Sequence, residues 1–147
     1  MDALLVDFLL RAKRATYAGH GAEAESSRPA SHDLGYAEGR FAYYDTYLGG
    51  ERFAGEEALW DNGAPVWAMN YCGRVLDPAG FSGDFLKAAL FAVPPETPFR
   101  GPKVFQDGAF TYRCQVEGDA DWFAGREWIE KDGALIYEGA FHGGIVR

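Results

Sequence analysis

The sequence predicts an α+β fold: an N-terminal helix, a mostly antiparallel and strongly curved sheet of about seven strands built from hairpins, and a second helix at about 82–93. Aromatic residues make up 16% of the 147 residues, a share that favours strands. Two segments carry apolar residues at helical spacing. Short turn signals divide the rest of the chain, at Gly49-Gly50, Asn62-Gly63, Asp107-Gly108 and Asp132-Gly133. Asn-Gly and Asp-Gly are typical of antiparallel hairpins, because the tight turn needs a positive φ at both central residues.

The first element is a helix over residues 2–17. Its apolar residues recur three and four positions apart and form one stripe, made of Leu4, Leu5, Phe8, Leu9, Ala12 and Ala15. Gly19 follows, and glycine readily adopts the left-handed conformation that ends a helix. A polar loop over residues 19–33 comes next. It is long for a connection inside a compact domain, and such loops tend to be functional or mobile.

Three strands, the second helix and four further strands complete the predicted order. The first three strands form a meander between residues 41 and 72, through the turns at Gly49-Gly50 and Asn62-Gly63. The second helix begins after Ser82, a favourable N-cap, and ends before Pro94. The pattern indicates no internal repeat, and the length is that of a single domain over residues 1–147.

The charge of the chain argues against several kinds of partner. The formal net charge is −8 at pH 7 and the basic residues are scattered, whereas a nucleic-acid-binding protein needs a basic face. An anionic membrane surface is disfavoured for the same reason. No apolar run reaches the ~18 residues of a membrane span, and no basic signal-peptide pattern begins the chain. We therefore expect a cytoplasmic protein with no nucleic acid and no membrane among its partners.

Metal and cofactor motifs are missing from the sequence. Cys72 and Cys114 form neither a CxxC pattern nor a zinc pattern, so small buried, reduced thiols are the better interpretation. The spacing of His20, His32 and His142 matches no metal motif. The glycine pairs lack the lysine and serine or threonine of a phosphate loop. We expect no cofactor and no metal.

The two turns of the meander predict which side chains share a face of the sheet. If Gly49-Gly50 and Asn62-Gly63 are two-residue turns, Tyr43 faces Glu56, and Asp45 lies on the same face as both. Asp45 and Glu56 are then diagonal neighbours, about 7 Å apart or less. The wall around them is aromatic, with Tyr43, Trp60, Trp67 and Tyr71. A slip of one residue in either turn would separate the two carboxylates.

A carboxylate pair in an aromatic wall has two interpretations. Asp45 and Glu56 could raise each other's pKa or bind a cation or hydrogen-bond donor, which makes them the floor of a pocket. The alternative is a buried polar network in which Arg52, Arg28 or tyrosine hydroxyls satisfy both carboxylates.

The turn at Asp132-Gly133 places a second pair of acids together. By the same reasoning Ile129 faces Ile136, and Glu127 faces Glu138. Like charges directly opposed are destabilising unless something lies between them. Neutralisation by Arg113 on a neighbouring strand is the preferred interpretation, and a second acid/base pair is the alternative.

The long loop contributes two further candidates, Arg28 and His32. If the loop covers the aromatic face, either residue reaches an acidic group of a ligand. The alternative for His32 is a loop histidine bonded to the backbone. Ser31, His32 and Asp33 are adjacent in sequence, and adjacency alone does not make a catalytic triad, whose members converge from separate segments.

Several runs of residues carry a resemblance to a known family. They are Phe8-Leu-Leu-Arg-Ala-Lys-Arg-Ala-Thr-Tyr-Ala-Gly, Ser26-Ser-Arg-Pro-Ala-Ser-His-Asp-Leu, Tyr44-Asp-Thr-Tyr-Leu-Gly-Gly, Phe53-Ala-Gly-Glu-Glu, Pro65-Val-Trp-Ala-Met-Asn-Tyr and Phe141-His-Gly-Gly. The chain resembles an uncharacterised bacterial domain family of unknown function, whose members occur alone or C-terminal to an Xre-type helix-turn-helix. The resemblance spans almost the whole chain and implies a stand-alone sensor or effector module.

The favoured function is a small-molecule-binding or sensing domain with its pocket on the aromatic sheet face. Its predicted ligand-binding residues are Asp45, Glu56, Tyr43, Trp60, Trp67, Tyr71, Arg28 and His32. One alternative is a protein–protein interaction module that forms a homodimer or meets a regulator through an exposed aromatic face. Another is an enzyme that uses the carboxylate pair for acid/base chemistry. Whether the first helix fills the aromatic face, and whether the sheet closes on itself, stays open at this point.

Overall fold

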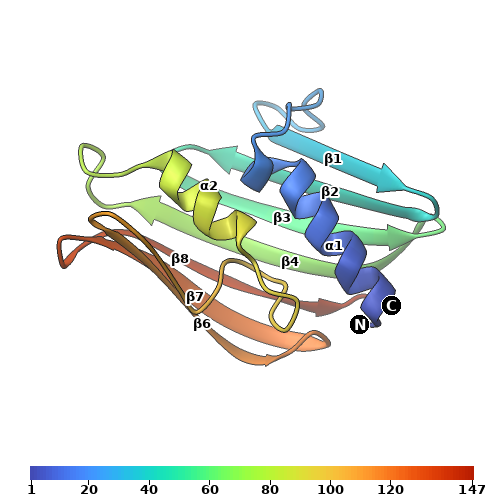
Figure 1. Cartoon of the computed structure of the whole chain (residues 1–147). Coiled ribbons are helices and arrows are strands. Elements are labelled where there is room, and N and C mark those ends of the chain that lie inside the picture. Colours follow the sequence, from blue (N-terminus) through green and yellow to red (C-terminus); the bar gives the residue numbers. More distant parts are fainter.

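The structure of the chain, a computed structural model, describes residues 1–147. The elements in chain order are α1 (Ala3–Ala15), the 3₁₀ turn η1 (Tyr17–Gly19), β1 (His32–Glu38), β2 (Phe41–Gly49), β3 (Arg52–Asp61), β4 (Ala64–Val75), α2 (Gly83–Phe91), β5 (Val104–Asp107), β6 (Phe110–Asp119), β7 (Trp122–Lys131) and β8 (Ala134–Ile145). All strands belong to one antiparallel sheet with the order β1-β2-β3-β4-β8-β7-β6-β5. The sheet is open, and β1 and β5 are its edge strands; Figure 1 shows β1 at one edge.

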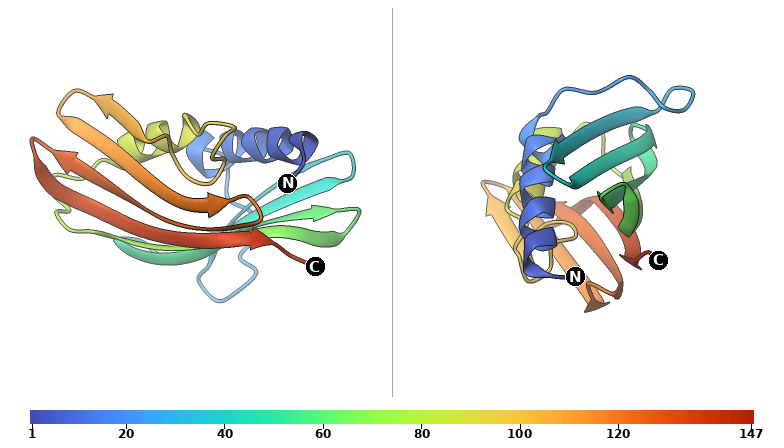
Figure 2. Two further views of the ribbon diagram at one scale, coloured as in Figure 1. Left: turned by 90° about the horizontal axis from the view of Figure 1, so that it is seen from below. Right: turned by 90° about the vertical axis from the view of Figure 1, so that its right-hand side faces the viewer.

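The predicted α+β class is confirmed. Both helices lie on one side of the curved sheet, and we call the sheet face toward them the inner face and the other the outer face (Figure 2). The core lies between the helices and the inner face, because the buried apolar side chains of both helices and of the strands form a single cluster. Neither helix has the length and apolar character needed to cross a membrane.

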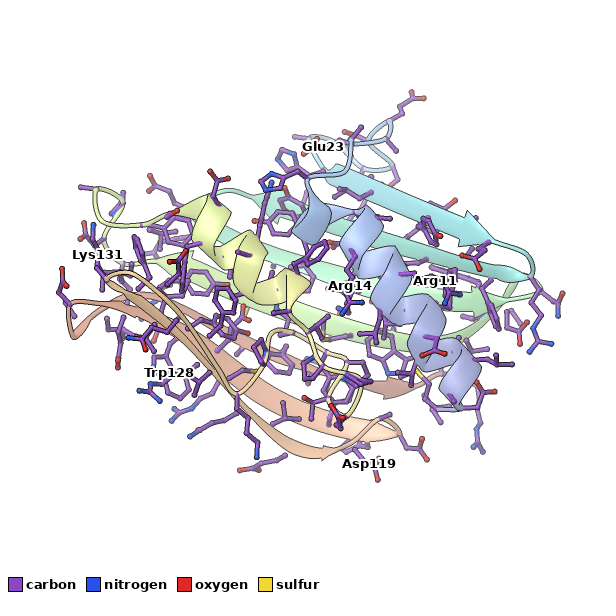
Figure 3. The ribbon with its side chains drawn as sticks, viewed as in Figure 1. Arg11, Arg14, Glu23, Asp119, Trp128 and Lys131 are labelled. Atoms are coloured by element: carbon purple, nitrogen blue, oxygen red, sulfur yellow. The ribbon has the colours of Figure 1, made fainter.

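The two expected helices form where their sequences favour them. Asp2 caps α1, with its carboxylate accepting a hydrogen bond from the Leu5 amide at 2.9 Å, and Ser82 caps α2 in the same way. The apolar stripe of α1 is buried at Phe8 and Leu9. Arg14 lies between the two helices and donates to backbone carbonyls at the end of α2 (Figure 3).

The sheet has eight strands, where about seven were expected. The additional strand is β1, which begins at His32, inside the segment predicted as a polar loop. It joins β2 through Gly39, at φ +60°, and Arg40. A Gly-Arg pair is not one of the strong hairpin dipeptides, so the sequence carries no clear signal for this turn.

The register of β3 differs from the predicted one on both sides. On the β2 side Gly49 pairs with Phe53, so the turn is longer than two residues and Asp45 faces Glu57 instead of Ala54. On the β4 side Asp61 faces Ala64 as expected, but a bulge then shifts the pairing, and Glu57 faces Met69 instead of Ala68. Val66 is the unpaired residue of the bulge, and it directly follows Pro65, which has no N–H for the ladder and is tolerated in a sheet near such irregularities.

The last hairpin has the same irregularity. A bulge lies between Ile129 and Glu130, so Ile129 faces Tyr137 instead of Ile136. The bulge also places Glu127 opposite Gly139, and the predicted pair of Glu127 with Glu138 does not form.

The two halves of the chain repeat one another, although the sequence pattern indicated no repeat. Each half is a helix followed by a four-stranded meander, and the two meanders meet where β4 pairs with β8. The pairing is symmetric about Tyr71 and Phe141, since Trp67 faces Ile145 at one end and Val75 faces Tyr137 at the other. The sheet therefore has an approximate two-fold axis through its centre.

Matched sequence features support this pseudo-symmetry. Phe53-Ala-Gly-Glu-Glu in β3 corresponds to Phe123-Ala-Gly-Arg-Glu in β7, and in both strands the pairing register shifts after the sixth residue beyond the phenylalanine. Gly55 and Gly125 fill the same role: a Cβ would lie 2.5 Å from the Tyr71 hydroxyl oxygen at the first and 2.4 Å from Phe141 Cζ at the second. Each glycine makes room for the aromatic ring of its own half.

Candidate functional site

A cavity of about 250 Å³ lies over the inner face, between the β2–β3 turn, η1 and the start of α2. Its walls are mainly aromatic, and two charged side chains, Asp45 and Arg100, lie in its lining. The full lining consists of Tyr17, His32, Asp45, Tyr47, Gly49, Gly50, Phe53, Tyr71, Val75, Phe81, Leu86 and Arg100. A small, mainly apolar space with few polar groups is typical of a small-ligand site.

Asp45 is the polar group on the floor of this cavity. It is 4% exposed, and its Oδ1 accepts a hydrogen bond from the Tyr71 hydroxyl at 2.5 Å. Its Oδ2 has no protein donor. Burial and the charge of Glu57 on the facing strand raise the pKa of Asp45 to about 7, against the Tyr71 hydrogen bond and the positive charges of Arg100 and Lys13. Asp45 is therefore a buried carboxyl with one oxygen left for a partner.

Glu57, directly across from Asp45, is paired with a lysine from α1. The Lys13 ammonium donates to the Glu57 carboxylate and to the Phe99 carbonyl at 2.6 Å. Burial lowers the pKa of Lys13, although the charge of Glu57 opposes that shift. The ammonium thus connects α1, β3 and the segment after α2.

A second buried cluster surrounds Glu127, the counterpart of Glu57 in the other half. Arg100 holds its carboxylate with two hydrogen bonds, at 2.7 and 3.2 Å. The hydroxyls of Tyr112 and Tyr137 donate to the same carboxylate at 2.6 and 2.7 Å. Burial opposes ionisation of Glu127, but Arg100 and these hydroxyls outweigh it and lower its pKa. Glu127 is therefore fully partnered by protein groups.

The walls of the cavity are rings that contact one another. Tyr47 lies edge-on to Tyr17, with centroids 6.0 Å apart, and stacks on His32 at 4.7 Å. Phe53 packs on Tyr71 at 6.0 Å. At the rim, His32 Nδ1 lies 2.9 Å from the Glu23 carboxylate, which belongs to the loop before β1 (Figure 3). These rings belong to η1 and to the strands β1 to β4, so five elements together form the cavity walls.

A larger and more open concavity, of about 930 Å³, lies on the outer face. Arg74 and Glu138 form an ion pair there at 2.6 Å, and both are about half exposed. The charged side chains along it are exposed, half-buried like Glu130, or already paired like Glu127. Its one buried charged side chain, Glu127, already has hydrogen-bond partners in the protein. We therefore assign the candidate site to the inner cavity.

The structure brings three of the eight predicted site residues together at the cavity: Asp45, Tyr71 and His32. Tyr43 and Trp67 share the inner face with them, but both are fully buried in the core. The remaining three lie elsewhere. Glu56 and Trp60 are on the outer face, because the register of β3 is shifted, and Arg28 donates to the Thr46 hydroxyl on that same face at 2.8 Å.

The sequence reasoning missed several residues of the cavity. The acid that faces Asp45 is Glu57 and not Glu56, and the repeated Phe-Ala-Gly-x-Glu run would have identified it, because Glu127 occupies the same place. Arg100 comes from an irregular segment after α2 and had no signal. The aromatic wall residues that were not among the predicted site residues are Tyr17, Tyr47, Phe53 and Phe81.

The raised pKa of Asp45 leads to a prediction for stability. Its pKa rises from 3.8 to about 7 on folding, so the folded protein holds the proton more tightly, and stability falls as pH rises through that interval. We expect Asp45→Asn, which keeps an acceptor for Tyr71 and carries no charge, to stabilise the fold relative to the parent at about pH 8 and to stabilise it clearly less at about pH 5, which lies inside that interval. Urea unfolding at both pH values measures this. An equal effect at the two pH values would mean that Asp45 does not titrate in this interval.

Comparison with known proteins identifies a family without assigning a function. A family model described as "Domain of unknown function (DUF5680)" matches residues 45–146. The match includes β3 to β8 and Asp45 itself. No curated protein matches the chain, and no solved structure matches it.

Proposed function

We propose, from the premise that this chain belongs to the DUF5680 family of domains of unknown function, that it binds a small molecule in the inner-face cavity. The observation that carries the proposal is Asp45, a buried carboxylate with one oxygen that no protein group satisfies. Buried carboxylate oxygens usually have a hydrogen-bond partner, and Oδ2 of Asp45, which is not fully enclosed by protein atoms, is accessible to one from the cavity. A ligand that donates a hydrogen bond to Asp45 would supply that partner.

The contrast with Glu127 supports this choice of site. Glu127 is buried to the same degree, but an arginine and two tyrosine hydroxyls satisfy both of its oxygens. The fold can therefore neutralise a buried acid fully where no ligand is needed. At Asp45 it provides only the Tyr71 hydroxyl and an adjoining aromatic cavity. In an aromatic space, a small number of polar groups is enough to orient a ligand.

A sensing role in a bacterial cytoplasm is a further part of this proposal. The resemblance to domains that occur alone or behind a helix-turn-helix suggests that ligand binding in such a domain controls a partner. The loop before β1 contacts the cavity lining at one point, where Glu23 bonds to His32. A ligand that contacts this rim would stabilise one arrangement of the loop, which a partner could detect.

Acid/base catalysis is the second candidate. A general acid or base works best when its pKa lies near the working pH, and the pKa of Asp45 is about 7. Its hydrogen bond to Tyr71 joins two residues of the cavity lining. An enzyme would convert the bound molecule, and a sensor would release it unchanged, so recovery of the compound after incubation separates the two.

A thermal-shift screen against metabolites tests the binding proposal. A ligand at a hundred times its Kd should add about 2.7 kcal/mol to stability, which corresponds to a few degrees in Tm. We expect the shift to be lost in Asp45→Asn. Glu56→Gln is the matched control, because Glu56 is an exposed carboxylate one strand away on the outer face, and it should keep the full shift. A shift lost equally in both variants, or in neither, would place the ligand elsewhere.

A further inference from the structure

The buried charges of the inner face do not balance. Three carboxylates, Asp45, Glu57 and Glu127, lie there with two cations, Lys13 and Arg100. Lys13 pairs with Glu57, and Arg100 pairs with Glu127 and approaches Glu57 only at 3.8 Å. No cation lies within ion-pair distance of Asp45. When Asp45 is ionised, the buried set carries one unpaired negative charge, and it lies at the cavity.

The cavity walls are suited to a positive charge. Ring faces attract cations, and the attraction grows when water is excluded. Two rings of this cavity already have cations on them: the Arg100 guanidinium lies 5.0 Å from the centroid of Tyr71, and the Lys87 ammonium lies 4.8 Å from that of Tyr17. Tyr47, Phe53 and Phe81 line the same space, and no side-chain cation is paired with their rings.

We infer that the ligand of this cavity is a small organic cation, an amine or quaternary ammonium whose positive charge lies against Asp45 and whose apolar part contacts the aromatic walls. This inference rests on the proposed function. Such a ligand would supply the third cation of the buried set and a partner for Oδ2 of Asp45. The cavity volume of about 250 Å³ limits it to a small molecule.

The other charged groups around Asp45 are compatible with a cation. Glu57 on β3 faces Asp45 directly and adds negative potential. Arg100 adds positive potential, but two hydrogen bonds to Glu127 offset its charge. Lys13 on α1 is paired with Glu57, Lys87 on α2 lies over the ring of Tyr17, and His32 on β1 is bonded to Glu23 at the rim. The remaining titratable groups are the tyrosine hydroxyls, of Tyr17 on η1, Tyr43 and Tyr47 on β2, and Tyr71 on β4.

Titration calorimetry of the intact protein with matched pairs of probes tests the inference. The probes are tetramethylammonium, choline and phenethylamine, with 3,3-dimethyl-1-butanol as the neutral isostere of choline and 2-phenylethanol as that of phenethylamine. We expect at least one cation to bind, with its neutral isostere weaker by about tenfold or more. Asp45→Asn should abolish this preference, and Glu56→Gln should keep it.

The pH dependence of choline binding gives a readout that is independent of the variants. Choline keeps its charge at every pH, so any dependence arises from the protein. Because the cation prefers ionised Asp45, affinity should fall about tenfold per pH unit below the Asp45 pKa of about 7 and should be flat above it. Binding just below that pH should release protons.

Three results would overturn the inference, and they separate it from the proposed function. If cations and neutral isosteres bind equally, the cavity does not select charge. If the metabolite screen yields only neutral or anionic ligands that depend on Asp45, the cavity binds small molecules but not cations. If no compound of any charge binds, both the inference and the proposed function fail.

Discussion

Replacing Arg100 by methionine is expected to lower the free energy of unfolding by about 3–5 kcal/mol. Methionine keeps an apolar stem in a buried position, but it removes the two hydrogen bonds to Glu127 and the positive charge beside it. Glu127 would then be a buried carboxylate held only by tyrosine hydroxyls. Breaking one side of a buried pair is costly because the remaining charge is uncompensated. Urea unfolding near neutral pH measures the loss.

Two further variants show whether the loss comes from the unpaired charge. Arg113→Met changes an exposed arginine on β6 and should alter stability by no more than about 0.5 kcal/mol. Arg100→Met combined with Glu127→Gln removes both charges and keeps the hydrogen bonds from the tyrosines. We expect the double variant to be more stable than Arg100→Met alone. If it is less stable, the role of Arg100 is packing and not neutralisation.

Phe123→Ala is expected to cost about 3–5 kcal/mol, the usual cost of removing a fully buried phenylalanine. Phe123 stacks on Phe99 with centroids 3.8 Å apart and on Trp67 at 5.8 Å. It also contacts Phe141, at 6.3 Å. Removing its ring opens a space in the centre of the core that its rigid aromatic neighbours cannot fill. Thermal and urea unfolding measure the change.

The repeat provides the control for this substitution. Phe53 occupies the position in β3 that Phe123 occupies in β7, but it is only partly buried and lines the cavity. We therefore expect Phe53→Ala to cost less than about half as much. Equal costs for the two substitutions would indicate that the cavity at Phe53 is closed and packed in solution.

The helices and the fold class were predictable because their signals are local. The stripe around Phe8 and Leu9 and the N-cap at Ser82 depend on residues within a few positions of one another. The hairpin at Asn62-Gly63 is also local, and its innermost pair, Asp61 with Ala64, is confirmed. The strand β1 could not be placed in this way because the turn at Gly39 does not stand out in the sequence.

The register of β3 was wrong for reasons that lie outside the hairpin dipeptides. The longer turn after Gly49 shifts the β2–β3 pairing by an odd number of residues, and the bulge at Val66 shifts the β3–β4 pairing by one. Each odd shift turns the side chains of β3 to the other face relative to one neighbour. The two errors cancel between β2 and β4. Asp45 and Tyr71 therefore share a face as predicted, while Glu56 and Glu57 exchange places.

The floor of the candidate site was thus partly predictable, and its charge partners were not. Asp45 and Tyr71 follow from alternation along two strands. Lys13 and Arg100 approach from a helix and from an irregular segment, and their contacts depend on how these pack on the sheet. No spacing in the sequence encodes such a contact.

The pseudo-two-fold axis of the sheet suggests how such a site could evolve. A single chain in which β4 pairs with β8 about Tyr71 and Phe141 has the form of two fused subunits of a homodimer. Duplication and fusion of an ancestral gene would produce it, and fusion allows the two copies to diverge. The partner of Glu57 across the ladder is Asp45, while that of Glu127 is Cys114. Because Tyr71 likewise corresponds to Phe141, the acid and its hydroxyl donor exist in one copy only. A symmetric ancestor would have two equivalent sites, whereas the fused chain can devote one copy to its ligand and the other to stability.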